Sequence, residues 1–160
     1  MKKAFTLIEM MVVITIISIL AAVAMPNYMV FILRAQVVES YELVNDLKPY
    51  VKEYYQHEGK FPANNRAAGL PDPDKLIGNY VTSVELENGA FHLTLGNRVN
   101  QQLQGKVLTI RPAVVEGSPN SPYAWISGYA EPAPGMQAVG ANKTTIDPQN
   151  LPYTSRSTQP

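Results

Sequence analysis

The chain has 160 residues, and its 13 Lys and Arg balance 13 Asp and Glu, so the formal net charge is zero. That balance argues against a general electrostatic attraction to nucleic acid or to an anionic surface. The sequence has no cysteine, which excludes disulfides and thiolate chemistry, and its length allows one domain with a membrane segment.

A short basic leader and a long apolar run open the chain. Glu9 is the one formal charge between Lys3 and Arg34, and a helix over this run would extend about 45 Å. A carboxylate near the interior of a bilayer costs several kcal/mol unless a partner neutralises it. The run therefore predicts a membrane-spanning helix, and Glu9 needs an explanation of its own.

Two ordinary interpretations of this segment are open on the residues alone. One is a secretory signal peptide, with Ala22-Val23-Ala24 as its cleavage site. The other is a single-pass anchor, which Lys2 and Lys3 would orient by staying on the cytoplasmic side. Both predict an uninterrupted apolar core, so neither accounts for the acid.

A third interpretation gives the acid a role. If residues 1–4 are removed on the cytoplasmic side, Phe5 becomes the N-terminal residue and carries a positive amine. An amine and a carboxylate on neighbouring apolar helices cost less as a pair than apart. Glu9 would then set the register of helices packed side by side, rather than act in catalysis.

The residues from Lys2 to Glu9, KKAFTLIE, resemble the class III signal of type IV pilins. The resemblance implies that a prepilin peptidase cuts between Ala4 and Phe5 and methylates the new amine. It also implies an acid at the fifth mature position, here Glu9, and an apolar helix followed by a proline, here Pro26. Type IV pilins usually have Gly where this chain has Ala4, which implies slower cleavage rather than none.

The helix is predicted to continue beyond the apolar run to a total of about fifty residues. Pro26 lacks an N–H and should kink or locally melt the helix near Ala22 to Met25. Apolar residues then recur at helical spacing on one face, and Gly59 ends the helix. The residues of that face are Leu33, Val37, Tyr41, Val44, Leu47, Val51 and Tyr54. We expect the first half to pack in lipid or in a filament core and the second half to support a globular head.

A proline-rich loop is predicted after the helix, over FPANNRAAGLPDPDKL. Asp72 and Asp74 in this loop could suggest calcium. Two acids fall short of the roughly six to eight oxygen ligands that Ca²⁺ takes. Turn chemistry is therefore the better interpretation of both residues.

Four short antiparallel strands are predicted next, in YVTSVELEN, AFHLTLG, KVLTIRP and YAWIS. Asn88-Gly89 marks a hairpin turn between the first two strands. Phe91 and Leu93 share one face of the second strand, so His92 is predicted to face solvent on the other. The strands and the long helix together predict an α+β head.

The resemblance to type IV pilins continues through this head. Residues 96–112 look like the central sheet of the family, and residues 125–128 read Trp-Ile-Ser-Gly where these pilins read Trp-x-Cys-Gly. By the same resemblance, Ser127 and Ser155 occupy the positions of the family's usual disulfide. Such a bridge would contribute about 3–4 kcal/mol, whereas a hydrogen bond between the hydroxyls replaces only about 1 kcal/mol. We therefore expect a looser region over residues 129–160.

The expected layout is the type IV pilin fold, in which one long N-terminal helix packs against a roughly four-stranded antiparallel sheet. Its parts in chain order are a leader peptide at 1–4, the hydrophobic transmembrane or filament-core half of the helix at 5–28, the amphipathic half at 29–58, a connecting loop at 59–78, the antiparallel sheet at 79–128 and an irregular C-terminal region at 129–160. The resemblance implies the boundary of the leader, and the other boundaries follow the changes of pattern along the chain.

The resemblance implies a structural subunit of a type IV pilus, a helical homopolymer of copies of this chain that serves adhesion, twitching motility or DNA uptake. The implied partners are the prepilin peptidase, the pilus assembly machinery and, before assembly, the bacterial inner membrane. The assembled filament is extracellular. A low-copy minor pilin or a type II secretion pseudopilin would share the N-terminal segment, and a membrane-anchored or secreted protein with an ordinary signal peptide is a more distant alternative.

No pattern in the sequence indicates an enzyme. The histidines are His57 and His92, and no nucleophile with a partner base, phosphate-binding loop or metal-spaced cluster stands out. We therefore expect no catalytic residues, no metal and no cofactor.

Overall fold

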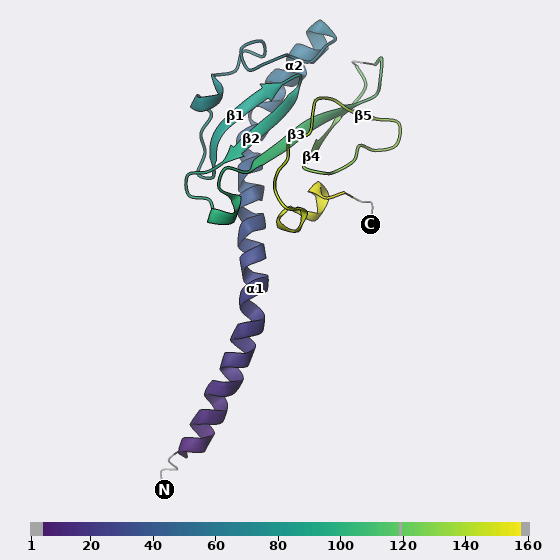
Figure 1. Cartoon of the computed structure of the whole chain (residues 1–160). Coiled ribbons are helices and arrows are strands. Elements are labelled where there is room, and N and C mark those ends of the chain that lie inside the picture. The colour runs from purple at the N-terminus through teal and green to yellow at the C-terminus, as the bar shows by residue number, and fades with distance from the viewer. Residues whose placement is uncertain (1–4, 119, 158–160) are drawn as a thin grey trace. The chain divides into compact units, whose positions relative to one another are not determined.

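Helices α1 (Leu7–Asn45) and α2 (Lys48–Glu58) lead the fold in a computed structural model that describes residues 5–118 and 120–157 (Figure 1). The single helix predicted from the sequence is therefore divided in two. Pro49 lies in the first turn of α2, where the missing N–H has no helical partner to lose. Inside a continuous helix the same residue would remove a hydrogen bond and crowd the preceding turn, which explains the division.

The second helix ends at the glycine that the sequence indicates. Gly59 has a φ of 67°, and its N–H donates to the carbonyl oxygen of Tyr55 at 3.0 Å, which forms a left-handed C-cap. Tyr55, rather than the predicted Tyr54, continues the buried face of the helix. Its ring stacks on Phe61 with 4.1 Å between the centroids, so the start of the following loop is packed against the helix.

A five-stranded antiparallel sheet follows the helices. The strands are β1 (Val81–Glu87), β2 (Ala90–Leu95), β3 (Val107–Val114), β4 (Ala124–Ser127) and β5 (Gln137–Ala138). Their order across the sheet is β1-β2-β3-β4, and β5 pairs with the end of β3. The predicted α+β fold is confirmed, and β5 adds a strand within the region expected to be irregular.

The turn between β1 and β2 is formed by the two residues that the sequence singles out. Asn88 and Gly89 both have positive φ, 49° and 86°, as the tightest hairpin turns require. Glycine is needed at the second position for another reason as well, because a Cβ there would lie 2.7 Å from the ring of Phe61. The turn and the loop after α2 therefore constrain each other.

The hydrophobic core lies between the sheet and the helical residues from Leu33 onward, which belong to the same compact unit. Figure 1 shows β1 to β3 crossing α2 and the adjoining turns of α1. The register places Phe91 opposite Ile110, with both side chains buried against the helices. Burial of a large apolar side chain contributes about 1.5–3 kcal/mol. The fully buried members of this core include Val37, Val44, Val51, Phe91, Leu93 and Leu108.

The segment after β4 packs on the head more closely than the missing disulfide suggests. Ile146 and Leu151 are fully buried. The hydroxyl of Tyr129 donates to the carbonyl oxygens of Thr144 and Ile146, at 3.1 Å each. These contacts hold the segment on the head without a covalent link. That the region is looser than the core stays a prediction.

His92 is buried, and the prediction that it faces solvent is wrong: 3 % of its surface is exposed. The cause is the segment around Lys143. The backbone N–H of Lys143 donates to Thr109 Oγ1 at 3.0 Å, and the same hydroxyl lies 3.0 Å from His92 Nδ1. The Lys143 ammonium pairs with Glu87, whose Oε2 lies 3.6 Å from His92 Nε2. Strand alternation gives the face of a residue, but not whether a distant segment covers that face.

We expect the stability of the head to fall in mild acid because of His92. Burial lowers the pKa of His92, as does the charge of Lys143, against smaller opposing effects of Glu87 and Glu85. The unfolded chain therefore binds more protons than the folded one near the ordinary histidine pKa of about 6.5, so the free energy of unfolding rises with pH. This contribution is complete above about pH 7 and is lost as the pH falls through 6.5 and below.

Urea unfolding of the full-length chain in detergent micelles at a series of pH values measures this slope. A His92→Gln variant should flatten it. A wild-type free energy of unfolding that stays constant from about pH 7.5 to 5.5 would contradict the assignment.

Candidate functional site

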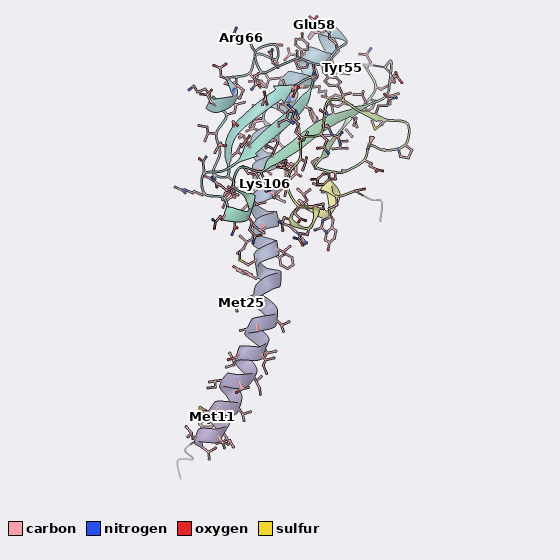
Figure 2. The ribbon with its side chains drawn as sticks, in the orientation of Figure 1. Met11, Met25, Tyr55, Glu58, Arg66 and Lys106 are labelled. Atoms are coloured by element: carbon pink, nitrogen blue, oxygen red, sulfur yellow. The ribbon has the colours of Figure 1, made fainter. Side chains whose placement is uncertain are left out.

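The apolar part of α1 keeps its side chains exposed within the described chain. The most apolar 18-residue window has a mean hydropathy of 2.6 and none of it is buried, so α1 is long and apolar enough to cross a membrane. Figure 2 shows side chains projecting from the ribbon between the labelled Met11 and Met25. Ile8, Leu20 and Val23 are each exposed by more than 60 %. An exposed apolar surface of this size requires lipid or other helices to cover it.

Glu9 lies in the first turn of α1, where it forms a reciprocal cap with Thr6. The carboxylate oxygen Oε2 accepts hydrogen bonds from the Thr6 backbone N–H at 2.7 Å and from its hydroxyl at 2.8 Å. The Thr6 hydroxyl in turn accepts from the Glu9 N–H at 3.3 Å. This is a capping box, and its Thr-x-x-Glu spacing is visible in the sequence. It gives the acid a role within its own helix, which differs from the predicted pairing with a neighbouring amine.

The cap accounts for a hydrogen-bond acceptor at position 9, but it does not account for a negative charge there. A neutral glutamine oxygen could accept the same two hydrogen bonds, and in apolar surroundings it would be less costly than a carboxylate. Phe5, the residue on the other side of Thr6, is 76 % exposed and therefore accessible to a neighbouring molecule. Within residues 5–118 and 120–157, the ion pairs of the head do not include the Glu9 carboxylate, so pairing of its charge stays a prediction.

Ala4 and Pro26 are the other two positions that the sequence singles out in the N-terminal segment. Ala4 lies outside the described residues. Pro26 lies within α1, which continues as helix through Ala22 to Met25, so this stretch is not melted. A kink at Pro26 stays a prediction.

Ser127 and Ser155 meet in the folded head. Their hydroxyl oxygens are 2.7 Å apart, and the Tyr41 hydroxyl lies 2.6 Å from Ser155 Oγ. Ser155 is 1 % exposed, so these three hydroxyls form a small polar cluster in a buried setting. The hydrogen bonds connect α1, the end of β4 and the C-terminal segment, although their sequence separations are large.

Gly128 makes this close approach possible. Its φ is +59°, and a Cβ at this position would lie 2.6 Å from the carbonyl oxygen of Ser155. The following N–H, that of Tyr129, donates to the same oxygen at 2.8 Å. A glycine directly after Ser127 therefore lets two backbone segments touch.

Among residues 5–118 and 120–157, no group of three or more His, Asp or Glu side chains is placed to hold a metal ion. His57 is exposed near the end of α2, and His92 is engaged by Thr109. The described residues form a packed head and an apolar helix, and the feature that calls for a partner is the exposed apolar surface of α1.

Comparisons with known proteins match both parts of the chain. A family described as pilin, a bacterial filament protein, matches residues 33–154, and the prokaryotic N-terminal methylation motif matches residues 1–25. A type IV major pilin protein PilE1 of Neisseria gonorrhoeae is 41% identical over 98% of this chain and 88% of its own length. A fimbrial protein of Neisseria meningitidis serogroup A is 38% identical over 98% of this chain and 95% of its own. The fimbrial protein EcpC of Eikenella corrodens is 39% identical over 73% of this chain and 78% of its own.

Proposed function

The chain belongs to the pilin family of bacterial filament proteins, and we propose that it is a structural subunit of a type IV pilus. The observation that carries the proposal is the uncovered apolar segment of α1, which overlaps an N-terminal methylation motif. Helices of this kind can cover one another when many copies of the chain assemble. The relatives named as major pilins match the chain along nearly all of it, and no observation favours the low-copy or secretion alternatives.

We propose that the leader is removed between Ala4 and Phe5 by a prepilin peptidase, which also methylates the new amine. The methylation motif over residues 1–25 supports this order of events. Alanine has the smallest side chain after glycine, so it should slow the cut without preventing it.

Mass spectrometry of the N-terminal peptide from cells tests the proposed function. The expected N-terminal residue is methylated Phe5. A chain that begins at Met25 would show an ordinary signal peptide, and an intact Met1 would show a simple anchor. Either result would contradict assembly through a processed pilin N-terminus.

In the assembly that we propose, the subunit is first anchored in the inner membrane by α1. It then exchanges lipid contacts for contacts with copies of itself. The pilus assembly machinery would drive this exchange, and the finished filament lies outside the cell. Glu9 favours docking where the amine of an incoming Phe5 neutralises its carboxylate, because the two charges cost less together than apart in apolar surroundings. The filament is then a helical homopolymer whose apolar helices fill the core.

Replacement of Pro26 should have a smaller effect than replacement of Glu9. Pro26→Ala restores an N–H to the helix and removes a break in its hydrogen-bond ladder that is worth about 3 kcal/mol. We expect a stiffer α1, seen as a small gain in helical circular dichroism of the full-length chain in micelles. The yield of sheared filaments should fall only about two- to threefold, since register and charge are retained. A loss as complete as that of a Glu9 variant would contradict this ranking.

A further inference from the structure

The outer edge of β1 is covered by the loop that follows α2. β1 ends the strand order β1-β2-β3-β4, so within residues 5–118 and 120–157 one of its two sides faces no other strand (Figure 1). Such an edge presents backbone N–H and C=O groups with which a strand of another molecule can pair. The loop over residues 59–80 lies against this side, and its Ala63 carbonyl oxygen accepts from the N–H of Asn88 at 3.2 Å.

Asn65 makes the contact at the middle of the edge. Its Nδ2 donates to the carbonyl oxygen of Val84 at 3.0 Å, and its Oδ1 accepts from the N–H of Leu86 at 2.7 Å. In an antiparallel ladder, the backbone groups of alternate residues point to the same side of the strand. Val84 and Leu86 therefore direct these groups away from β2, where a neighbouring strand would bond to them. The side-chain amide of Asn65 takes the place of a peptide group of that strand.

The orientation of the Asn65 amide is fixed by its surroundings. Nδ2 also donates to the carbonyl oxygen of Pro71 at 3.0 Å, so the nitrogen faces two carbonyl groups while the oxygen faces an N–H. A flipped amide would satisfy none of these three groups. Asn65 is 4 % exposed, and Ala68 and Leu70 of the same loop are buried in the core. The loop therefore cannot leave the edge without exposing apolar surface.

A charge stands between the two residues that Asn65 contacts. Glu85 is exposed at the middle of β1. If β1 of a second copy paired antiparallel about this residue, the two Glu85 side chains would lie directly opposite each other, where like charges are destabilising. Charged side chains on an edge strand are a general means by which proteins avoid pairing through their sheets. The buried amide and the exposed carboxylate thus oppose the same event.

We infer that the edge of β1 is a pairing surface for β1 of a second copy of this chain, and that Asn65 keeps it closed. An antiparallel pair of identical edges is self-complementary, which is why a second copy fits this surface. Closure matters wherever heads are crowded, as in a filament of the proposed kind, because it leaves α1 as the surface through which copies join. The inference itself does not depend on the proposed function, since the edge and its cover both belong to the head.

Single thiols can report this pairing because the sequence has no cysteine. Glu85→Cys removes the charge and would place two thiols opposite each other across a β1–β1 pair. The full-length chain in non-ionic detergent micelles is treated with a mild oxidant, and the yield of disulfide-linked dimer is measured for Glu85→Cys alone and together with Asn65→Ala. We expect on the order of tenfold more dimer when Asn65→Ala is present, because the edge groups then lack partners.

Two matched variants separate edge pairing from general effects. The Asn64 Oδ1 accepts from the N–H of Ala67 at 2.9 Å, a bond within the loop rather than to β1. Asn64→Ala should therefore leave the dimer yield of Glu85→Cys unchanged. Glu58→Cys places the thiol at the exposed end of α2, so it reports chance collisions of heads and should not respond to Asn65→Ala.

Hydrogen exchange at the Leu86 N–H measures the closure directly. We expect this amide to exchange at least about tenfold faster in Asn65→Ala, because its buried acceptor is lost, while the amides of β2 and β3 stay protected. Asn65→Asp is a milder variant that keeps an acceptor for Leu86 but has no donor for the two carbonyl groups. It should give a dimer yield between those of the parent and Asn65→Ala, and it decides the matter if Asn65→Ala unfolds the whole head.

Three outcomes would overturn the inference. Slow exchange of Leu86 in Asn65→Ala would show that the amide does not close the edge. Fast exchange without more Glu85→Cys dimer would show that the open edge does not pair with a second copy. Loss of protection throughout the sheet in both Asn65 variants would make this residue one of general stability. None of these results bears on the N-terminal processing, which the mass spectrometry of Phe5 tests separately.

Discussion

Glu9→Ala is expected to leave the chain in the membrane and to reduce the yield of filaments by at least about tenfold. Alanine makes the helix more apolar, so membrane insertion is not impaired. In the assembled state the change leaves the neighbouring Phe5 amine without its partner, and an unpaired buried charge costs about 3–5 kcal/mol, where 1.4 kcal/mol already corresponds to tenfold. The measurements are membrane fractionation of the chain and the amount of filament sheared from cells.

Two further variants separate the charge of Glu9 from its part in the helix cap. Thr6→Ala removes the capping hydroxyl, a loss of about 1 kcal/mol, but keeps the carboxylate. Glu9→Gln keeps an acceptor for the Thr6 N–H but removes the charge. If pairing with an amine is the reason for the acid, Glu9→Gln should fail like Glu9→Ala and Thr6→Ala should assemble. The reverse ranking would show that the cap is what assembly needs.

Replacement of both Ser127 and Ser155 with cysteine is expected to stabilise the head strongly. The two hydroxyl oxygens are already 2.7 Å apart, so a disulfide requires little movement of the backbone. A bridge that closes a loop of this length contributes about 3–4 kcal/mol, from which about 1 kcal/mol is subtracted because Tyr41 loses its hydrogen bond to Ser155. The thermal midpoint of the double variant should rise by roughly 10 °C in oxidising buffer.

Thermal unfolding of the full-length chain in micelles, with and without reductant, measures this gain. Each single cysteine variant serves as a control and should show no dependence on reductant. Tyr41→Phe reports the contribution of the tyrosine hydroxyl alone. Limited proteolysis then tests the expectation of a looser C-terminal region: the bridge should slow cleavage within residues 129–157, and a region as resistant as the core before bridging would contradict that expectation.

Local patterns in the sequence were sufficient to predict the main elements of the head. The spacing of Leu33, Val37 and Val44 indicates the buried face of α1, and all three residues are buried. The Asn88-Gly89 pair forms the predicted turn because only a few residue types accept positive φ at both positions. These features depend on neighbours in the sequence, which is why the sequence reveals them.

Features that depend on distant segments could not be predicted in the same way. His92 is buried by contacts around Lys143, and no alternation within β2 reports on a residue so far along the chain. The proximity of Ser127 and Ser155 came from a resemblance between sequences, since spacing alone pairs no two residues. The Thr6–Glu9 cap was the exception, because its spacing is local and could have been read directly.

The hydrogen bonds between Thr6 and Glu9 bear on how easily subunits could come and go. Within a lone subunit, two hydrogen bonds from Thr6 stabilise the Glu9 carboxylate, although they do not neutralise its charge. In the scheme that we propose, docking adds the positive charge of a neighbouring Phe5 amine to an acid that is already hydrogen-bonded, and a subunit that leaves the filament returns its acid to the Thr6 cap.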